Sequence, residues 1–173
     1  MLNRYTLSAL GVLIVLAALF LLQTNEEERI LQRLEQLRAL TEISSPESGV
    51  GQLTRASQIG QYFSEQTVFD LTRAGHGTII IDSRDELVRR IIRGRARLVM
   101  LELALRDAQV RIEDDTAEVV LTGSGLGQIK GEQDRFLEMH TVAVRLRKQA
   151  DDWVITGATH LRDERQSSPG GAD

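Results

Sequence analysis

The clearest pattern in this chain is a strict alternation of apolar and polar positions in its second half. Val142, Val144 and Leu146 occupy every second position, which is typical of a strand with one buried face. Leu101, Leu103 and Leu105 repeat the pattern. Residues 97–162 therefore predict about three or four long strands, each longer than the usual five or six residues.

The residues before this sheet predict helices that cover it. One helix begins at Thr24 or Asn25, which can cap it, and ends at Ser44-Ser45-Pro46. Its apolar stripe consists of Ile30, Leu31, Leu34, Leu37, Leu40 and Ile43. A coiled-coil dimer is an alternative use of this stripe, although about two heptads are short for one.

The next segments predict two more helices and two short strands. A helix over residues 49–63 would turn Val50, Leu53, Ile59 and Phe63 inward, although Gly51 and Gly60 weaken it. Residues 66–72 and 78–82 are typical of short strands. Ser83 and Glu86 have the spacing of a capping box, which predicts a third helix.

An uncharged apolar run covers residues 5–22 and predicts a transmembrane helix about 27 Å long. Arg4 precedes the run and three glutamates follow it, so the positive-inside rule predicts a cytoplasmic N-terminus. We expect residues 1–4 in the cytoplasm, an anchor at 5–23, a domain at 24–164 and a disordered tail at 165–173. This predicts a single-pass protein of a bacterial inner membrane with a periplasmic or extracellular domain. A cleaved signal peptide is the alternative, but no small-x-small cleavage site follows the run.

Composition excludes several kinds of chemistry. The formal net charge of −4 over 173 residues gives no reason to expect nucleic acid. The absence of cysteine excludes disulfides, thiolate metal sites and thiol nucleophiles. The three histidines lack HxxxH or HxH spacing, so we expect neither a metal nor another cofactor.

The order of elements carries a resemblance to a known superfamily. Residues 62–70 (YFSEQTVFD), the start of the third helix at 83–87 (SRDEL) and the last strand at 153–156 (WVIT) are the matching segments. They resemble the nuclear transport factor 2-like superfamily with its SnoaL-like and ketosteroid-isomerase-like branches, here as a membrane-anchored bacterial member. The resemblance implies an α+β fold in which a curved antiparallel sheet wraps around about three helices to form a cone. Such cones include isomerases, dehydratases and cyclases, and also non-catalytic modules.

Four residues are candidates for a pocket inside the cone. Glu138 and His140 share the parity of Val142, and a carboxylate beside an imidazole can act as acid and base. Asp70 could join them from the first short strand, and Trp153 lies on the last strand. The alternative is a cone filled by its own side chains, with Glu138 and His140 at the rim and no catalytic role. We expect this small or plugged pocket.

Two surfaces are candidate interfaces. Leu137 and Met139 have the opposite parity to Val142 and would form an apolar outer patch, which predicts a homodimer or a cover by another envelope protein. Arg89, Arg90 and Arg93 belong to a basic patch with Arg84, Arg95 and Arg97. That patch is either solvated or in contact with lipid head groups or an acidic partner. The glycines of Gly123–Gly127 predict bends or bulges in a strand rather than a phosphate-binding loop.

The sequence favours a membrane-tethered, non-enzymatic interaction or assembly module. The alternative is a small-ligand binder, or an enzyme of the lyase or isomerase type, that uses the cone pocket. Whether the chain is an enzyme stays open at this point, because no residue set matches a catalytic motif.

Overall fold

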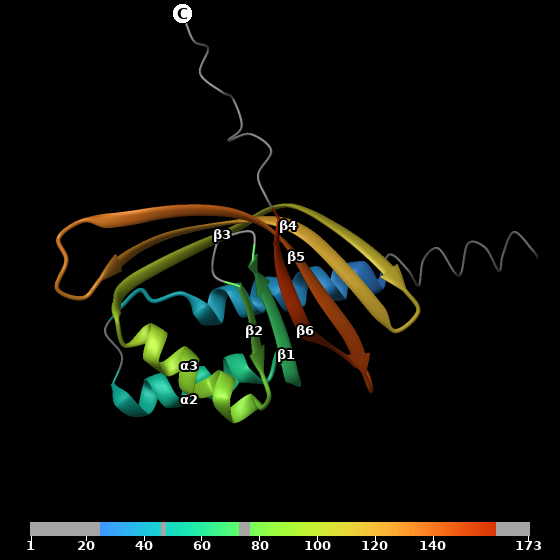
Figure 1. The fold of residues 1–173 in the computed structure, drawn as a ribbon, viewed down its shortest axis with the longest axis horizontal. Helices are drawn as coiled ribbons and strands as arrows, with labels where there is room; N and C mark the ends of the chain where they lie inside the picture. The colour runs from blue at the N-terminus through green and yellow to red at the C-terminus, as the bar shows by residue number, and fades with distance from the viewer. Residues whose placement is uncertain (1–24, 46–47, 73–76, 162–173) are drawn as a thin grey trace, which may run out of the picture.

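A computed structural model of the chain describes residues 25–45, 48–72 and 77–161. These residues form one curved six-stranded sheet whose inner face is covered by helices (Figure 1). The first helix covers residues 25–41. The other elements are α2 (Gly49–Gly60), β1 (Phe63–Leu71), β2 (Gly77–Ile81), α3 (Arg84–Arg95), β3 (Leu98–Glu113), β4 (Thr116–Ile129), β5 (Arg135–Gln149) and β6 (Asp152–Leu161).

The strand order in the sheet is β2-β1-β6-β5-β4-β3. The four long strands are consecutive antiparallel neighbours, as the sequence predicts. The expectation of a wholly antiparallel sheet is wrong at one pair, because β1 lies parallel to β6. β1 pairs with β6, the last strand of the antiparallel series, and β2 forms the edge of the sheet beyond β1.

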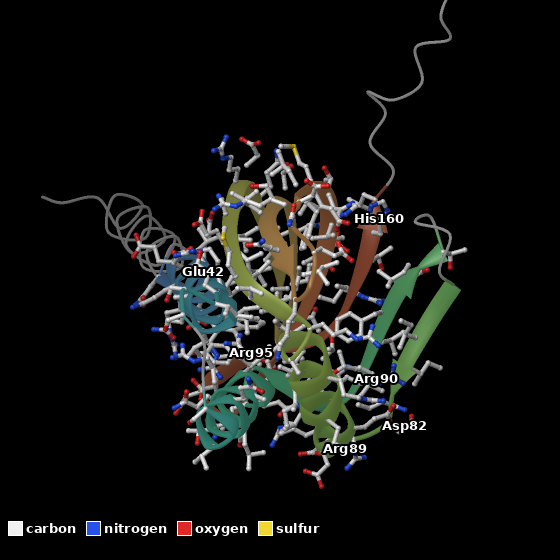
Figure 2. All side chains as sticks on the ribbon, turned by 90° about the vertical axis from the view of Figure 1, so that its left-hand side faces the viewer. Glu42, Asp82, Arg89, Arg90, Arg95 and His160 are labelled. Atoms are coloured by element: carbon white, nitrogen blue, oxygen red, sulfur yellow. The ribbon has the colours of Figure 1, made fainter. Side chains whose placement is uncertain are left out.

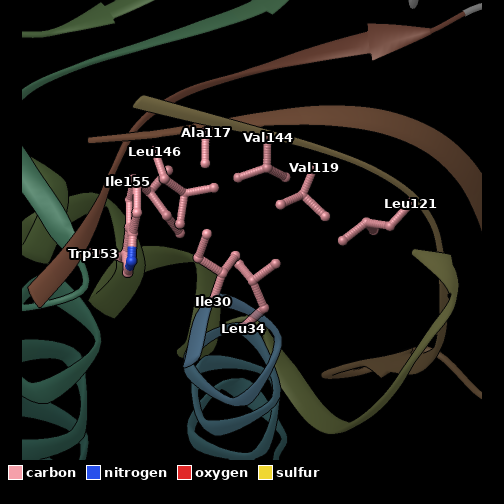
Figure 3. Packing of buried hydrophobic residues seen from close by; sticks show 9 residues of the cluster. All are labelled: Ile30, Leu34, Ala117, Val119, Leu121, Val144, Leu146, Trp153 and Ile155. Carbon is pink, nitrogen blue, oxygen red and sulfur yellow. The ribbon is translucent and has the colours of Figure 1, made fainter. Parts of the chain in front are cut away.

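Helix 25–41 lies under the arch of the long strands (Figure 1). Its apolar stripe packs against the inward positions of the sheet, as predicted, and Ile30 and Leu34 are almost fully buried. Figure 3 shows these two side chains against the sheet. The other buried residues of this core are Ala117, Val119, Leu121, Val144, Leu146, Trp153 and Ile155. Burial of apolar area of this kind is the main stabilising term of the fold.

Arg95 differs from its predicted place in a solvated basic patch. Its side chain is only 6% exposed, and its guanidinium donates to the backbone carbonyl oxygens of Thr41 at 2.6 Å and Glu42 at 3.4 Å. These carbonyls belong to the end of helix 25–41, which attracts positive charge. Arg95 therefore holds the end of one helix from the last turn of another (Figure 2).

The predicted inward face of α2 is wrong at its first half. Val50 is 77% exposed and Leu53 is 55% exposed. Helix α2 packs on α3 rather than beneath the sheet, so only its second half is covered, through Ala56, Ile59 and Gly60. A Cβ atom at Gly60 would lie 2.8 Å from Cγ2 of Val88, so the glycine permits this close approach. Phe63, expected at the end of this helix, begins β1.

The predicted anchor at residues 5–23, the N-terminal residues 1–4 and the tail at 165–173 lie outside the described residues. Within residues 25–45, 48–72 and 77–161, no helix combines the length and the apolar character that a membrane span needs.

Candidate ligand-binding cavity

Strand β5 presents Glu138 and His140 to the inside of the curved sheet. In the ladder between β4 and β5, Glu138 pairs with Gly125 and His140 pairs with Gly123. Directly paired residues share a face of the sheet, and Val142 follows on that face. This is the face that the alternation in the sequence predicts.

A cavity of about 440 Å³ lies between this inner face and helix 25–41. The expectation of a small or plugged pocket is therefore wrong, since pockets for small molecules commonly measure about 300–1,000 Å³. The side chains of the core fill only one end of the cone. The walls of the cavity are mainly apolar and include Leu34, Leu37, Phe63, Phe69, Leu101, Leu103, Leu105, Leu121, Phe136, Val142, Val144 and Ile155.

Alternate glycines on β4 make room for this cavity. An added Cβ at Gly123 would meet only a backbone oxygen at 4.0 Å, whereas one at Gly127 would lie 2.3 Å from the ring of Phe136. The ring of Phe136 thus covers Gly127, and the space beside Gly123 stays open. The pairing of β4 with β5 has no break, so these glycines mark no bulge in that ladder. Two register shifts lie in the ladder between β3 and β4, and Asp107, within the second of them, has a φ of 54°.

The polar side chains at the cavity form a short row. Nε2 of His140 lies 3.4 Å from Oε2 of Glu138, and Nδ1 of His140 lies 3.1 Å from Nε2 of His160. The two imidazole rings meet edge to face, with centroids 5.0 Å apart. The side chains of Glu138 and His140 are 64% and 50% exposed, so the row lies at the mouth of the cavity rather than in its depth.

His160 is the member of this row that sequence reasoning misses. Simple alternation from Trp153 and Ile155 would turn His160 outward. The ladder between β5 and β6 has a register shift at Thr156, after which His160 pairs with inward-facing Val142. One extra residue reverses the parity of the rest of a strand. His160 therefore faces inward near the end of β6 (Figure 2).

Asp70, one of the predicted pocket residues, does not reach the cavity. It pairs with Thr159, whereas its neighbour Phe69 pairs with Ala158 on the cavity wall. Asp70 thus belongs to the outer face, where its Oδ1 accepts hydrogen bonds from the backbone N–H and the hydroxyl of Thr72. It holds the end of β1 and is separated from Glu138 and His140 by the sheet.

Trp153, the fourth predicted pocket residue, belongs to the core instead. It is 3% exposed, and its indole N–H donates to Oε2 of Glu26 at 2.7 Å. Burial acts to raise the pKa of Glu26, but hydrogen bonds from Trp153 and Lys148 outweigh that effect and leave the pKa below its usual value. Trp153 thus packs in the core and is joined through Glu26 to the start of helix 25–41.

Arg38 is the cationic side chain on the cavity wall. Its Nε donates to Oε1 of Glu35 at 2.7 Å, and its Nη1 donates to Glu42 and, at 3.0 Å, to the carbonyl oxygen of Leu103. The hydrogen bond to Glu35 raises the pKa of Arg38 above its usual value. Arg38 is therefore committed to joining helix 25–41 to the edge of β3.

The predicted interface residues lie away from the cavity. Leu137 and Met139 point to the outer face of β5, where they are 72% and 56% exposed. Arg89, Arg90 and Arg93 are exposed on α3. Arg90 lies 2.7 Å from Glu86, one helical turn earlier, and this hydrogen bond lowers the pKa of Glu86.

Across the part of the chain that the structure describes, no group of three or more histidine, aspartate or glutamate side chains is placed to hold a metal ion.

No known family model matches this sequence, and no curated protein matches it. Solved structures do match its fold. The Kfla4162 protein from Kribbella flavida has a TM-score of 0.67 at 10% identity, with 80% of this chain and 91% of that chain covered. An NTF2-like family protein from Streptomyces avermitilis has a TM-score of 0.61 at 14% identity, covering 82% and 99%. The hexachlorocyclohexane dehydrochlorinase LinA-type3 from Novosphingobium barchaimii LL02 has a TM-score of 0.57 at 10% identity, covering 80% and 87%.

Similarity at such low identity establishes the fold and leaves the function to the site itself. The curved sheet and the helices beneath it agree with the fold of these structures. The chain therefore has the α+β cone fold of the NTF2-like proteins.

Proposed function

We propose that this protein binds a small, mainly apolar molecule in its cone cavity. The observation that carries the proposal is the cavity of about 440 Å³, with apolar walls and with Glu138 and His140 at its mouth. An apolar space with a few convergent polar groups is the usual form of a small-molecule site. The preference for a non-enzymatic assembly module rested on the predicted anchor, the translocated domain and the missing catalytic motif, and the cavity favours the small-ligand alternative.

A neutral fluorescent probe tests the binding function. N-phenyl-1-naphthylamine emits strongly in apolar surroundings and can be titrated into the full chain in lipid nanodiscs, with empty nanodiscs as the blank. Gly123→Val would add a Cβ atom that has no neighbour closer than 4.0 Å, and its two methyl groups would take up space in the cavity that Gly123 lines. We expect it to weaken binding by about tenfold or more, the factor that corresponds to about 1.4 kcal/mol.

The matched control is Thr122→Val, one residue earlier on the outer face. Thr122 pairs with Thr141 there, so its variant should bind the probe as the native chain does. Equal binding by the native chain and Gly123→Val would contradict the proposal.

Proton transfer is a second candidate function, and the contact between Glu138 and His140 supports it. A carboxylate oriented by an imidazole at an apolar cavity can remove a proton from a carbon next to an electron-withdrawing group. One fold neighbour is a dehydrochlorinase by name, which fits a site equipped for elimination. The generic probe 5-nitrobenzisoxazole, which bases open with a change in absorbance, tests this role. Glu138→Gln should abolish any opening above the rate of empty nanodiscs, and no such rate in the native chain would exclude the function.

We also propose that the domain is tethered to the outer side of a bacterial inner membrane. The support is the apolar run at 5–22 with Arg4 before it. Protease added to spheroplasts should digest the domain. A protected domain, or a mature N-terminus near Gln23, would contradict this topology.

A further inference from the structure

We infer that the cavity selects ligands whose polar end is a hydrogen-bond donor, an amine or a hydroxyl, and excludes ligands that end in a carboxylate. This inference rests on the proposed ligand-binding function and adds the chemical class of the ligand. It follows from the charges at the cavity and from the contacts that each of them already makes.

The cation on the cavity wall is already paired with two carboxylates. Among the described residues that line the cavity, Arg38 is the one arginine or lysine. Its Nε and Nη2 both contact Oε1 of Glu35 at 2.7 Å. Its Nη1 contacts both Glu42 and the carbonyl oxygen of Leu103. These contacts use four of the five N–H donors of the guanidinium, and two carboxylates already balance its charge, so a ligand carboxylate would gain little from Arg38.

The anion at the mouth has more capacity for a ligand. Glu138 faces the cavity, and Oε2 of its carboxylate makes a long contact of 3.4 Å with Nε2 of His140. A carboxylate has about four lone-pair positions, so Glu138 can accept further hydrogen bonds. An amine or hydroxyl placed there would donate a hydrogen bond to Glu138. A second carboxylate would instead meet a like charge in a site from which the bound ligand displaces water.

His140 has no ring nitrogen left for a ligand carboxylate. One ring nitrogen faces Glu138 and the other faces His160, at 3.1 Å. Both nitrogens are therefore engaged, and neither is directed to a ligand carboxylate. His140 instead orients Glu138 toward the space beside Gly123 and Gly125.

The groove next to the mouth carries both signs of charge. Arg97 and Arg135 line it together with Glu132, Asp134 and Glu138. Two cations and three carboxylates produce no positive field at the entrance, and long-range steering therefore gives anions no advantage. Electrostatics at the mouth and inside the cavity favours the same class of ligand.

Three probes with one common apolar body test the inference. They are 2-naphthylmethylamine, 2-naphthalenemethanol and 2-naphthoate, titrated calorimetrically near neutral pH into the full chain in nanodiscs, with empty nanodiscs as the blank. We expect the amine to bind most tightly, the alcohol next, and the carboxylate at least about tenfold more weakly than the amine. Glu138→Gln keeps the shape of the side chain and removes its charge, so it should reduce the preference to within about threefold.

The matched control is Glu132→Gln, which removes a carboxylate of the neighbouring groove rather than of the cavity. It should leave the order of the three probes unchanged. Tight binding of 2-naphthoate to the native chain would overturn the inference and leave the ligand-binding function intact. Binding of none of the three, in the native chain as in Gly123→Val, would overturn the function and the inference together.

Discussion

Nδ1 of His140 lies 3.1 Å from Nε2 of His160 across the ladder between β5 and β6. Two neutral imidazoles at this distance share one proton between the facing nitrogens. The other nitrogen of His140, Nε2, donates a hydrogen bond to Glu138 when it carries the proton. The contact therefore predicts that His160 donates and that His140 carries its proton on Nε2.

We expect His160→Phe to remove the hydrogen bond to Nδ1 of His140 and to keep the edge-to-face contact between the two rings. Long-range proton–nitrogen NMR of the imidazoles should show one neutral tautomer of His140 in the native chain and an exchanging mixture in His160→Phe. His160→Gln keeps a donor and should retain the native tautomer. A proton on Nδ1 of His140 in the native chain at alkaline pH would contradict the assignment.

The burial of Arg95 predicts a large stability effect in an otherwise exposed basic patch. Arg95→Met removes the donor to the carbonyl oxygens of Thr41 and Glu42 at the end of helix 25–41. We expect a loss of about 2–4 kcal/mol in the free energy of unfolding. The hydrogen bonds from a charged donor are lost, and the carbonyl oxygens that accepted them no longer have this donor. Arg93→Met, at an exposed position of α3, should change the free energy of unfolding by no more than about 0.5 kcal/mol. Urea unfolding of both variants measures the difference, and equal losses would refute the role of Arg95.

The lowered pKa of Glu26 predicts acid sensitivity at the start of helix 25–41. A carboxyl group whose pKa is lower in the folded chain stabilises the fold above its unfolded pKa, and this stability is lost as the pH falls through the folded pKa. We expect unfolding free energy to fall below about pH 5, partly because protonated Glu26 no longer accepts fully from Trp153 and Lys148. Glu26→Gln should be less stable near neutral pH and should show a flatter acid limb. Fluorescence of Trp153, the one tryptophan of the chain, reports the change, and parallel pH profiles would contradict it.

Periodicity predicted most of the fold but only part of the site. The alternation around Val142 identified the buried face of β5, and with it the positions of Glu138 and His140, because side-chain parity is local. The same rule failed for His160, because the register shift at Thr156 depends on pairing with β5. Asp70 was misplaced for a related reason, since its face follows from the parallel pairing of β1 with β6.

Local pattern also left the partners of two helices undetermined. Val50 and Leu53 have helical spacing for a buried face, yet α2 packs only through its second half. Arg95 belongs to a run of arginines that is typical of a solvated patch, yet the end of helix 25–41 lies beside it. The size of the cavity likewise depends on the pairing of glycines on β4 with Glu138 and His140 on β5. The pattern within either strand alone does not show this pairing.

The outer face of the sheet predicts self-association. Leu137 pairs with Leu126 there and Met139 pairs with Ser124, so an uncharged strip crosses two strands. Exposed apolar strips of this kind usually mark an interface. We propose a second copy as its cover and expect Met139→Glu to weaken a dimer in sedimentation experiments on the full chain. Ser57→Glu, at an exposed position of α2, should not. A monomeric native chain would refute the homodimer and leave another protein as the cover.

The last prediction compares two glycines on the inner face of β4. Gly127→Ala would place a Cβ atom 2.3 Å from the ring of Phe136, whereas Gly123→Ala would have 4.0 Å to its nearest neighbour. Overpacking costs about 1–3 kcal/mol, so we expect Gly127→Ala to lower the free energy of unfolding by that amount. Gly123→Ala should be neutral or should stabilise by about 0.5 kcal/mol, because glycine loses more backbone entropy in a strand than alanine does. Phe136→Leu in the Gly127→Ala background should restore part of the loss, since a smaller side chain makes room for the added methyl group. Urea unfolding of the three variants decides the matter, and equal effects of the two alanines would show that Phe136 does not depend on Gly127.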